Sequence, residues 1–300
     1  MIDLAEVWNA GAVGRHAFYP WTAPMLEGHL QPSHGWSADD LLLALENNRL
    51  AGWAQATILN QGHMGMSLHP AGSIEMLVVT PQARGRGVGR ALLRAALAHF
   101  RQRGMTEARA SGAWPYGPHF HALADGSERS GVPADDPRAL ACLSAAGFTA
   151  IRRSWVMRFD MNGQAAALIH NMDGEGLVSD QARMGATWLD YAFRAWTLRE
   201  QHLPGDRGET LSQAIYARMD GLSDYDGKEY YALFGVYTTP GGRRQGHARR
   251  NLTALLSRLR SKGAAFVELH CYADNIPALG LYRELGFREV VSTTDFRLVF

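Results

Sequence analysis

The chain contains the same short pattern twice: an apolar run that ends in Thr-Pro, a turn rich in glycine and arginine, and an amphipathic helix. The first copy spans 74–93 and the second spans 231–252. Glycines let a backbone approach a ligand closely, and the first N–H groups of a helix have no partners within that helix. Because the helix dipole and nearby arginines add positive charge, each turn is expected to bind a pyrophosphate.

Two common phosphate-binding motifs do not fit these turns. A P-loop ends in Gly-Lys-Ser or Gly-Lys-Thr, but the lysines of this chain, Lys228 and Lys262, lie outside both turns. A dinucleotide-binding fingerprint needs a glycine where the chain has Arg90, and no clear parallel strand with an acidic ribose ligand follows at the usual distance. Nucleotide binding of these two kinds is therefore disfavoured.

Both turns match the six-residue pattern Arg/Gln-x-x-Gly-x-Gly/Ala, at 84–89 and at 243–248. In this the chain resembles the GNAT acetyltransferase superfamily, whose members hold the pyrophosphate of acetyl-coenzyme A with this turn and the pantetheine arm with the preceding strand. A glycine-rich connection without a ligand is the alternative, and the presence of two copies disfavours it. The resemblance implies that the following residues contact acetyl-coenzyme A: Leu77, Val79, Arg84, Gly85, Arg86, Gly87, Val88, Gly89, Arg90, Val236, Thr238, Arg243, Arg244, Gln245, Gly246, His247 and Ala248.

A second family element follows the second turn. Residues 275–287 match the signature Asn-x-x-Ala-x-x-x-Tyr-x-x-x-Gly-Phe at every fixed position. The resemblance implies that Asn275 contacts the cofactor and that the hydroxyl of Tyr282 faces the thioester sulfur as an acid. The two residues lie two helical turns apart, so one helix face can present both. Packing in the core is the alternative role for Tyr282.

The first half departs from this signature. When its Gly-Phe pair at 147–148 is aligned with the pair at 286–287, Leu143 stands in place of Tyr282 and Asp136 in place of Asn275. About 20 extra residues lie between turn and signature, within a Pro- and Gly-rich loop at 114–135 that could cover a site.

We therefore predict two tandem GNAT domains, an arrangement that resembles mycothiol synthase and related proteins. Residues 1–160 form a degenerate N-terminal domain that keeps the turn for acetyl-coenzyme A. Residues 161–300 form a catalytic C-terminal domain.

The predicted reaction is direct transfer of an acetyl group from acetyl-coenzyme A to a primary amine of a small molecule or peptide, within a ternary complex. A backbone N–H around 236–238 would hold the carbonyl oxygen, and Tyr282 would protonate the departing thiolate. Glu268 is the predicted base for the ammonium proton, with Glu229 as an alternative. A non-catalytic acyl-coenzyme A sensor is the alternative function, and the presence of both Asn275 and Tyr282 favours the enzyme.

Composition sets few further limits. A length of 300 residues suits two domains, and a formal net charge of +1 gives no electrostatic case for nucleic acid or a membrane. The two cysteines, Cys142 and Cys271, do not predict a disulfide framework. Because the sequence shows no signal-peptide pattern, we also expect a cytoplasmic protein. His63, His69 and the pair at 119–121 show no metal-binding spacing, so no metal is predicted. A monomer and a homodimer both stay open.

The pattern of apolar residues predicts an α+β fold, with a mixed sheet and helices on both faces. Helices are expected at 4–16, 38–48, 87–103 and 137–146, and strands at 50–59, 74–80, 106–111 and 151–160. In the second half we expect helices at 180–200 and 210–219, and no hairpin is evident before Tyr231.

Overall fold

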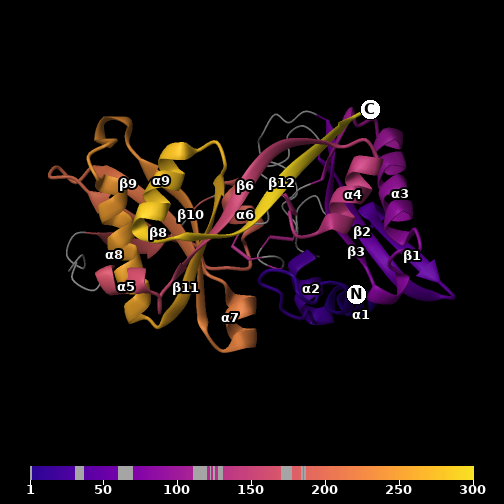
Figure 1. Cartoon of the computed structure of the whole chain (residues 1–300), viewed down its shortest axis with the longest axis horizontal. Coiled ribbons are helices and arrows are strands. Elements are labelled where there is room, and N and C mark those ends of the chain that lie inside the picture. The colour runs from indigo at the N-terminus through magenta and orange to yellow at the C-terminus, as the bar shows by residue number, and fades with distance from the viewer. Residues whose placement is uncertain are drawn as a thin grey trace.

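A computed structural model describes residues 2–30, 37–59, 70–110, 120–121, 123, 126–127, 131–169, 178–183, 185 and 187–300. Within these residues the strands form a single mixed sheet of twelve strands, with helices on both of its faces (Figure 1). The predicted α+β class is therefore confirmed. Residues 111–119 and several positions up to 130, which hold most of the predicted covering loop, lie outside the described residues.

The first half of the chain supplies six strands and four α-helices to the described structure. Their bounds are α1 Ile2–Gly11, α2 Ala23–Leu30, β1 Leu41–Glu46, β2 Arg49–Leu59, β3 Ala71–Val79, α3 Val88–Gln102, β4 Glu107–Ala110, β5 Val132–Pro133, α4 Pro137–Ala145 and β6 Thr149–Asp160.

The second half adds the remaining described strands and helices. Their bounds are α5 Gln164–Ile169, β7 Ser179–Ala182, α6 Trp188–Ala192, β8 Arg199–Pro204, β9 Thr210–Arg218, α7 Asp220–Asp226, β10 Glu229–Thr238, α8 His247–Ser261, β11 Ala264–Tyr272, α9 Ile276–Leu285 and β12 Arg288–Val299.

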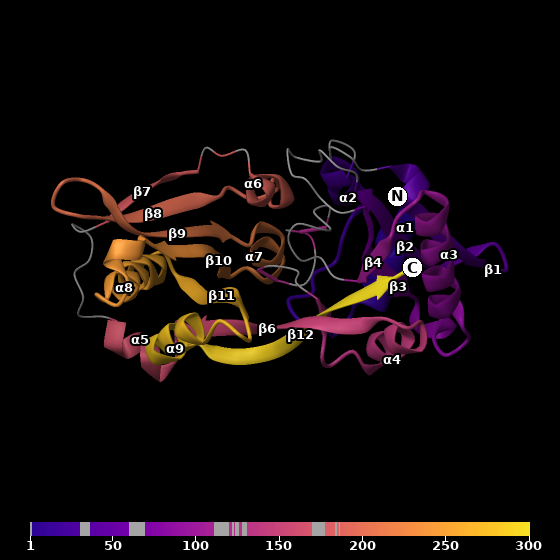
Figure 2. The same cartoon turned by 90° about the horizontal axis from the view of Figure 1, so that it is seen from above.

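The two halves exchange their last strands. The order across the sheet is β1-β2-β3-β4-β12-β6-β11-β10-β9-β8-β7, and the short β5 pairs with β12. The last strand of the chain, β12, thus completes the sheet beside β4 of the first half, while residues 154–160 of β6 of the first half pair with β11. Figure 2 shows both strands running from one half into the other. The division at residues 160 and 161 stays a prediction about the two sequence copies.

The pairing of β6 with β12 relates the two copies by an approximate two-fold axis. Thr149 pairs with Arg297, and Arg158 pairs with Arg288. The copies are separated by 139 residues, so Thr149 corresponds to Arg288 and Arg158 to Arg297. Exchanging each residue for its equivalent in the other copy therefore gives the same strand pairs. At the centre, Ser154 pairs with Thr293, which are also equivalent positions.

Hydrophobic cores fill both faces of the sheet. In the second half, α5, α8 and α9 cover one face, with Leu255 and Leu259 fully buried against the strands. The opposite face packs on α6 through Trp188 and Phe193. In the first half, α3 and α4 cover one face and α1 and α2 the other. Each fully buried Leu or Phe contributes about 1.5–3 kcal/mol, so these four layers fix the relative positions of the strands.

Three predicted helices are wrong. Residues 38–48 form a short 3-10 turn and then β1, which a tight turn joins to β2. Asn47 and Asn48 have φ of 49° and 60°, the backbone of a type I′ hairpin turn, and this pair was the missed signal. Residues 210–218 form β9, and among the described residues of 180–200 only α6 is an α-helix. Pairing with β8 and β10 overrides the local preference of β9.

We predict that neither half folds alone, because each would lose the strand that completes its sheet. Chains of residues 1–160 and 161–300, made separately, should show no cooperative urea unfolding, whereas the two produced together should recover it. Circular dichroism at increasing urea measures this. A cooperative transition for either piece alone would show that the exchanged strands are dispensable.

Candidate active site

The two glycine and arginine turns have the same backbone. Gly85 and Gly87 have φ of 76° and 90°, and the equivalent Arg244 and Gly246 have φ of 61° and 79°. Gly87 and Gly246 cap α3 and α8 without any side-chain hydrogen bond. The first hydrogen bonds of the two helices run from the Ala91 N–H to the Gly87 carbonyl, at 2.9 Å, and from the Arg250 N–H to the Gly246 carbonyl, at 3.0 Å. The N–H groups of the preceding three residues in each helix thus point out of the turn with no helical acceptor.

In the first half, Arg84 turns back toward the protein. Its Nε donates to the carbonyl of Val79 at 3.3 Å, and its Nη2 donates to the carbonyl of Gly11. Burial, followed by the charge of Arg138, lowers the pKa of Arg84. A depression of about 410 Å³ lined by Pro81, Arg84, Gly85 and Arg138 adjoins the turn. The first turn is therefore bordered by two guanidinium groups.

In the second half, the side chains of Arg243 and Arg244 are exposed. Gln245 closes the turn, since its Nε2 donates to the carbonyl of Gly241 at 2.8 Å. His247 Nε2 lies 3.3 Å from Gln245 Oε1. The turn is thus held in place by its own residues and leaves both arginines facing solvent.

The strand before the second turn, β10, extends beyond its pairing with the parallel strand β11. β10 pairs with β11 as far as Leu233 and Leu269, and β3 pairs with β4 as far as Ile74 and Ala110. On its other side β10 carries a bulge between Phe234 and Tyr237, where Gly235 has φ of 29°. The predicted contacts Val236 and Thr238 therefore lie beyond the last pair of β10 with β11, and we call this place the opening of the second half.

The signature residues follow β11 in the chain, at the start of α9 and within it. Asn275 caps α9, and its Oδ1 accepts a hydrogen bond from the Ala278 N–H at 3.4 Å. Asp136 caps α4 in the same way and forms an ion pair with Arg15 at 3.6 Å. Asn275 is thus a helix cap, and its contact with a cofactor stays a prediction.

Tyr282 is 8% exposed and packs in the core, with its ring 5.7 Å from that of Phe287. Within the described residues, its hydroxyl has no hydrogen-bond partner. Burial, with a smaller effect of Cys271, raises the pKa of Tyr282, so the hydroxyl keeps its proton at neutral pH. Leu143, at the equivalent place in the first half, is buried among apolar side chains. Only the second half therefore carries a proton donor at this position.

Glu268, the predicted base, is completely buried and fully bonded. Its Oε2 lies 2.6 Å from His16 Nε2 and 2.8 Å from Arg158 Nη2, and its Oε1 accepts the Ser127 N–H at 2.9 Å. His16 and Ser127 belong to the first half, so this carboxylate links the two halves.

The electrostatics of Glu268 do not suit a proton acceptor. Burial alone would raise its pKa, but the hydrogen bond and charge of His16, the charge of Arg158 and the Ser127 N–H together lower the pKa to about 2. A carboxylate of this acidity stays ionised throughout the neutral range. The contacts therefore weigh against the prediction that Glu268 is the general base. Glu229, the alternative, forms an ion pair with Arg218 at 2.9 Å at the start of β10, away from the turn.

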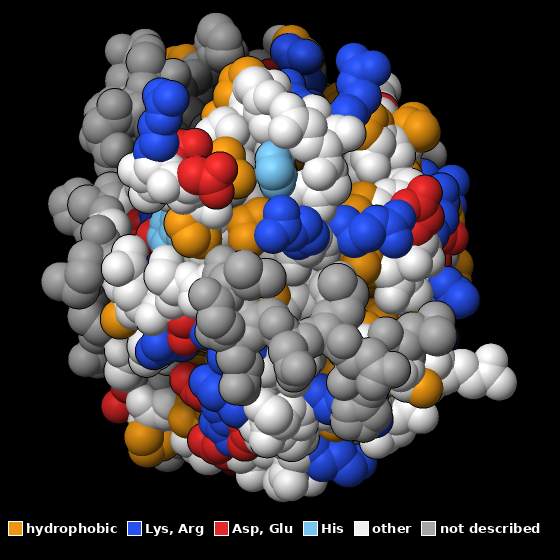
Figure 3. All heavy atoms as spheres, turned by 90° about the vertical axis from the view of Figure 1, so that its left-hand side faces the viewer, with side chains coloured by type: hydrophobic (Ala, Val, Ile, Leu, Met, Phe, Trp, Pro, Cys, Tyr) orange, Lys and Arg blue, Asp and Glu red, His pale blue; other side chains and the backbone are white. Residues whose placement is uncertain are grey.

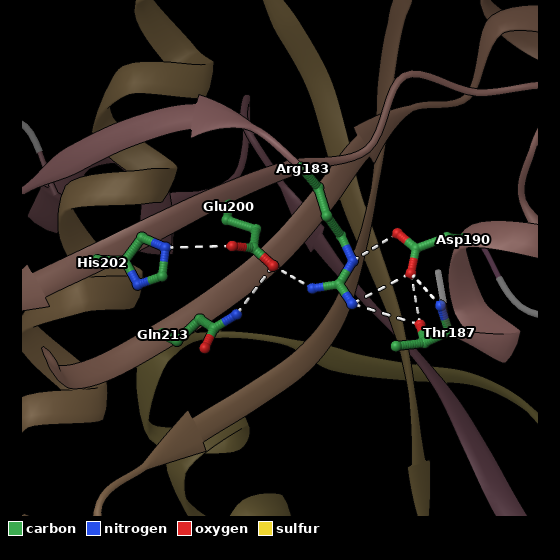
Figure 4. Close-up of polar contacts among 6 residues, drawn as sticks. All are labelled: Arg183, Thr187, Asp190, Glu200, His202 and Gln213. Atoms are coloured by element: carbon green, nitrogen blue, oxygen red, sulfur yellow. Dashed lines mark hydrogen bonds and ion pairs between the residues drawn. The ribbon is translucent and has the colours of Figure 1, made fainter. Parts of the chain in front are cut away.

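A polar network lies on the sheet of the second half, where β7, β8, β9 and α6 meet (Figure 4). Arg183 donates to Asp190 at 2.6 Å and also to Glu200. Glu200 accepts from Gln213 Nε2 at 3.1 Å and lies 3.3 Å from His202 Nε2. Sequence reasoning missed these residues because the β8–β9 hairpin was not recognised.

Other kinds of site find little support in the described residues. No group of three or more His, Cys, Asp and Glu side chains there could hold a metal ion, while His63, His69 and His119 lie outside the described ranges. None of the helices in the described part of the chain is long and apolar enough to cross a membrane. Figure 3 views the molecule from the side of the second half. Basic, acidic and apolar side chains of the described residues are interspersed on this face.

Comparison with known proteins defines the class. The family model of the acetyltransferase (GNAT) family matches residues 12–112 and 186–287. The chain belongs to this family, whose members are acetyl-coenzyme A-dependent acetyltransferases, and the two matches confirm the predicted tandem arrangement.

Curated relatives and solved structures agree with this class. The chain is 30% identical to a mycothiol acetyltransferase of Brachybacterium faecium over 74% of this chain and 66% of that protein. It is 30% identical to a mycothiol acetyltransferase of Clavibacter sepedonicus over 76% of this chain and 73% of that protein. A tandem GNAT protein from the clavulanic acid biosynthesis pathway superposes with a TM-score of 0.70 at 16% identity, covering 99% of this chain and 94% of that one. The last likeness concerns the fold alone.

We predict that Arg244→Gly stabilises the protein by about 1 kcal/mol, because Arg244 occupies a left-handed conformation that glycine adopts without strain. Arg243→Gly is the matched control. Arg243 has φ of −67°, so glycine there should reduce stability by about 0.5–1 kcal/mol. Urea unfolding of both variants measures the difference, and equal losses of stability would show that the turn is not strained.

We predict that Glu268 stabilises the protein above pH 4.5 and that this contribution is lost as the pH falls through 2. The pKa of about 2 in the folded state lies below the ordinary value of 4.5, so the difference amounts to about 3 kcal/mol at neutral pH. Urea unfolding of wild type and Glu268→Gln at pH 7 and pH 3 isolates it. The free energy of unfolding of the wild type should exceed that of the variant by a smaller amount at pH 3 than at pH 7. An unchanged difference would contradict the lowered pKa of Glu268.

Proposed function

We propose that the second half of the protein transfers an acetyl group from acetyl-coenzyme A to a primary amine of a small molecule. The observation that carries the proposal is the presence of three features together in the second half. These are the turn that begins α8, the separation of β10 from β11 after Leu233 and Leu269, and the buried, protonated Tyr282. Family membership adds independent support.

Each feature has a distinct part in the proposed reaction. N–H groups at 244–249 and the exposed Arg243 and Arg244 bind the pyrophosphate of acetyl-coenzyme A. A backbone N–H near Val236 stabilises negative charge on the carbonyl oxygen while the amine attacks. Tyr282 then donates its proton to the sulfur as the carbon–sulfur bond breaks.

The first half has a different role in this proposal. It keeps the backbone of the pyrophosphate turn and a basic depression beside it, but Leu143 replaces the acid. We therefore assign residues 1–160 to cofactor binding and structural support, and turnover to residues 161–300.

The relatives named as mycothiol acetyltransferases make a small-molecule amine related to mycothiol one candidate acceptor. An antibiotic, an amino acid derivative, a polyamine and a peptide N-terminus fit the same chemistry. A non-catalytic sensor of acyl-coenzyme A stays the alternative, and the partnerless hydroxyl of Tyr282 favours the enzyme, because a sensor needs no acid at the sulfur.

Calorimetric titration with acetyl-coenzyme A tests cofactor binding without an acceptor. Two sites are expected in wild type, one lost in Gly87→Glu and the other in Gly246→Glu, because each variant places a negative charge on the turn. Gly104→Glu and Gly263→Glu are matched controls. These glycines follow the same two helices, have φ of 73° and 80°, and leave equally open space for a side chain. Both controls should keep two sites, and no binding in wild type would refute the proposal.

We predict that Tyr282→Phe lowers kcat about 10²-fold or more, since it removes the proton donor, and leaves the affinity for acetyl-coenzyme A unchanged. Release of free thiol during acetylation of an acceptor amine measures kcat, and calorimetry measures affinity. Leu143→Ala at the equivalent place in the first half is the control and should keep turnover. Wild-type turnover in Tyr282→Phe would remove the acid from the mechanism.

A further inference from the structure

A histidine of the first half faces the proposed site of the second half. His16 follows α1, but its Nε2 lies 2.6 Å from Oε2 of Glu268 on β11. Arg158 donates to the same carboxylate oxygen, so Glu268 is an ionised acceptor and its hydrogen bond with His16 requires a hydrogen on Nε2. In the neutral ring the lone pair then lies on Nδ1, and within the described residues Nδ1 has no hydrogen-bond partner.

The pair lies close to the point where the strands separate. Glu268 pairs with Ala232 on β10, one residue before the last pair of Leu233 and Leu269. One residue of strand is about 3.3 Å long. His16 is therefore placed within reach, directly or through one water, of an amine bound at the opening.

The pair also lies on the appropriate face of the sheet. Val267 and Leu269 pack against the helices on the face that includes Tyr282. Because side chains alternate along a strand, Glu268 points to the opposite face, as does its neighbour Phe266, which packs on the other core. The thiolate departs on the side of Tyr282, so an amine that attacks the carbonyl from across the sheet approaches on the side of His16.

We propose that His16 is the general base of the reaction and that Glu268 is its positioning residue, an inference that rests on the proposed function. Nδ1 of His16 accepts a proton from the ammonium group. The electron pair of the broken N–H bond stays on the nitrogen, which becomes the nucleophile. The nitrogen–carbon bond then forms and the carbon–sulfur bond breaks. Tyr282 gives its proton to sulfur and regains one from the acylated nitrogen, and one proton stays on the amide.

In the described part of the chain, charged groups of both signs contact His16. The charged groups that face it are Glu268 on β11 and Arg158 on β6, whose Nη2 lies 3.3 Å from His16 Nε2. Ser127 contributes a backbone N–H to Glu268. The buried carboxylate of Glu268 sets the orientation of the His16 ring, an arrangement in which a carboxylate positions a histidine that acts as a base.

The kinetic test uses thiol release from acetyl-coenzyme A with glucosamine, cysteinamide and spermidine as acceptor probes. His16→Gln can still donate to Glu268 but has no base, so kcat at pH 7 should fall about 10²–10⁴-fold with KM for acetyl-coenzyme A unchanged. Its rate should recover as the pH approaches the pKa of the amine, because the free amine then forms in bulk water. Glu268→Gln should also lower kcat and change the pH profile.

The chain offers a matched control in the first half. His99 Nε2 lies 2.8 Å from Oδ1 of the buried Asp40, a pair of the same kind as His16 and Glu268. His99→Gln removes that pair without touching the second-half site and should keep wild-type kcat. If His16→Gln kept wild-type kcat with an unchanged pH profile, the proposal would be overturned while the acetyltransferase function stood.

A second measurement does not depend on turnover. In ¹⁵N NMR spectra of the neutral histidine, His16 should carry its hydrogen on Nε2 and none on Nδ1, and Glu268→Gln should weaken this preference. A hydrogen on Nδ1 in wild type overturns the assignment of the base whatever the kinetics. Absence of thiol release by wild type with every probe counts against the proposed function, and the base then falls with it.

Discussion

The antiparallel pairing of β6 with β12 holds the rest of the structure in place. These strands are the last elements of the two sequence copies, and each leaves its own half to complete the sheet of the other. Their register maps onto itself across Ser154 and Thr293. One continuous sheet therefore joins two turns of the same backbone, and the position of each half is set by hydrogen bonds that belong to both.

This exchange brings the first half to the site of the second. Arg158 reaches Glu268 because β6 lies beside β11, and His16 and Ser127 complete the shell of the same carboxylate. Removal of one partner from a buried charge cluster costs about 3–5 kcal/mol, so the halves are coupled through this point. A copy with leucine in place of the signature tyrosine can thus stay necessary to the structure of the other copy.

Much of the site could be predicted from local pattern. The turns at 84–89 and 243–248 and the signature that contains Tyr282 are short motifs in which the residue types themselves impose backbone geometry, so their structure follows from spacing. The hairpins β1–β2 and β8–β9 were less accessible. Asn47 and Asn48 carried a readable turn signal that was missed, whereas β9 is defined by its two neighbouring strands and has a composition that suits a helix equally well.

The sequence by itself determined the family, the two turns rich in glycine and arginine, and the presence of a tyrosine in only one copy of the signature. Each of these depends on residues within about twenty positions of one another. Only the tertiary structure decided that the halves exchange strands and that Glu268 is a bonded, ionised carboxylate and not a free base. His16 and Glu268 are 252 positions apart, and nothing in either local sequence indicates the other. Contacts of that kind arise from the order of strands in the sheet, which long-range packing determines.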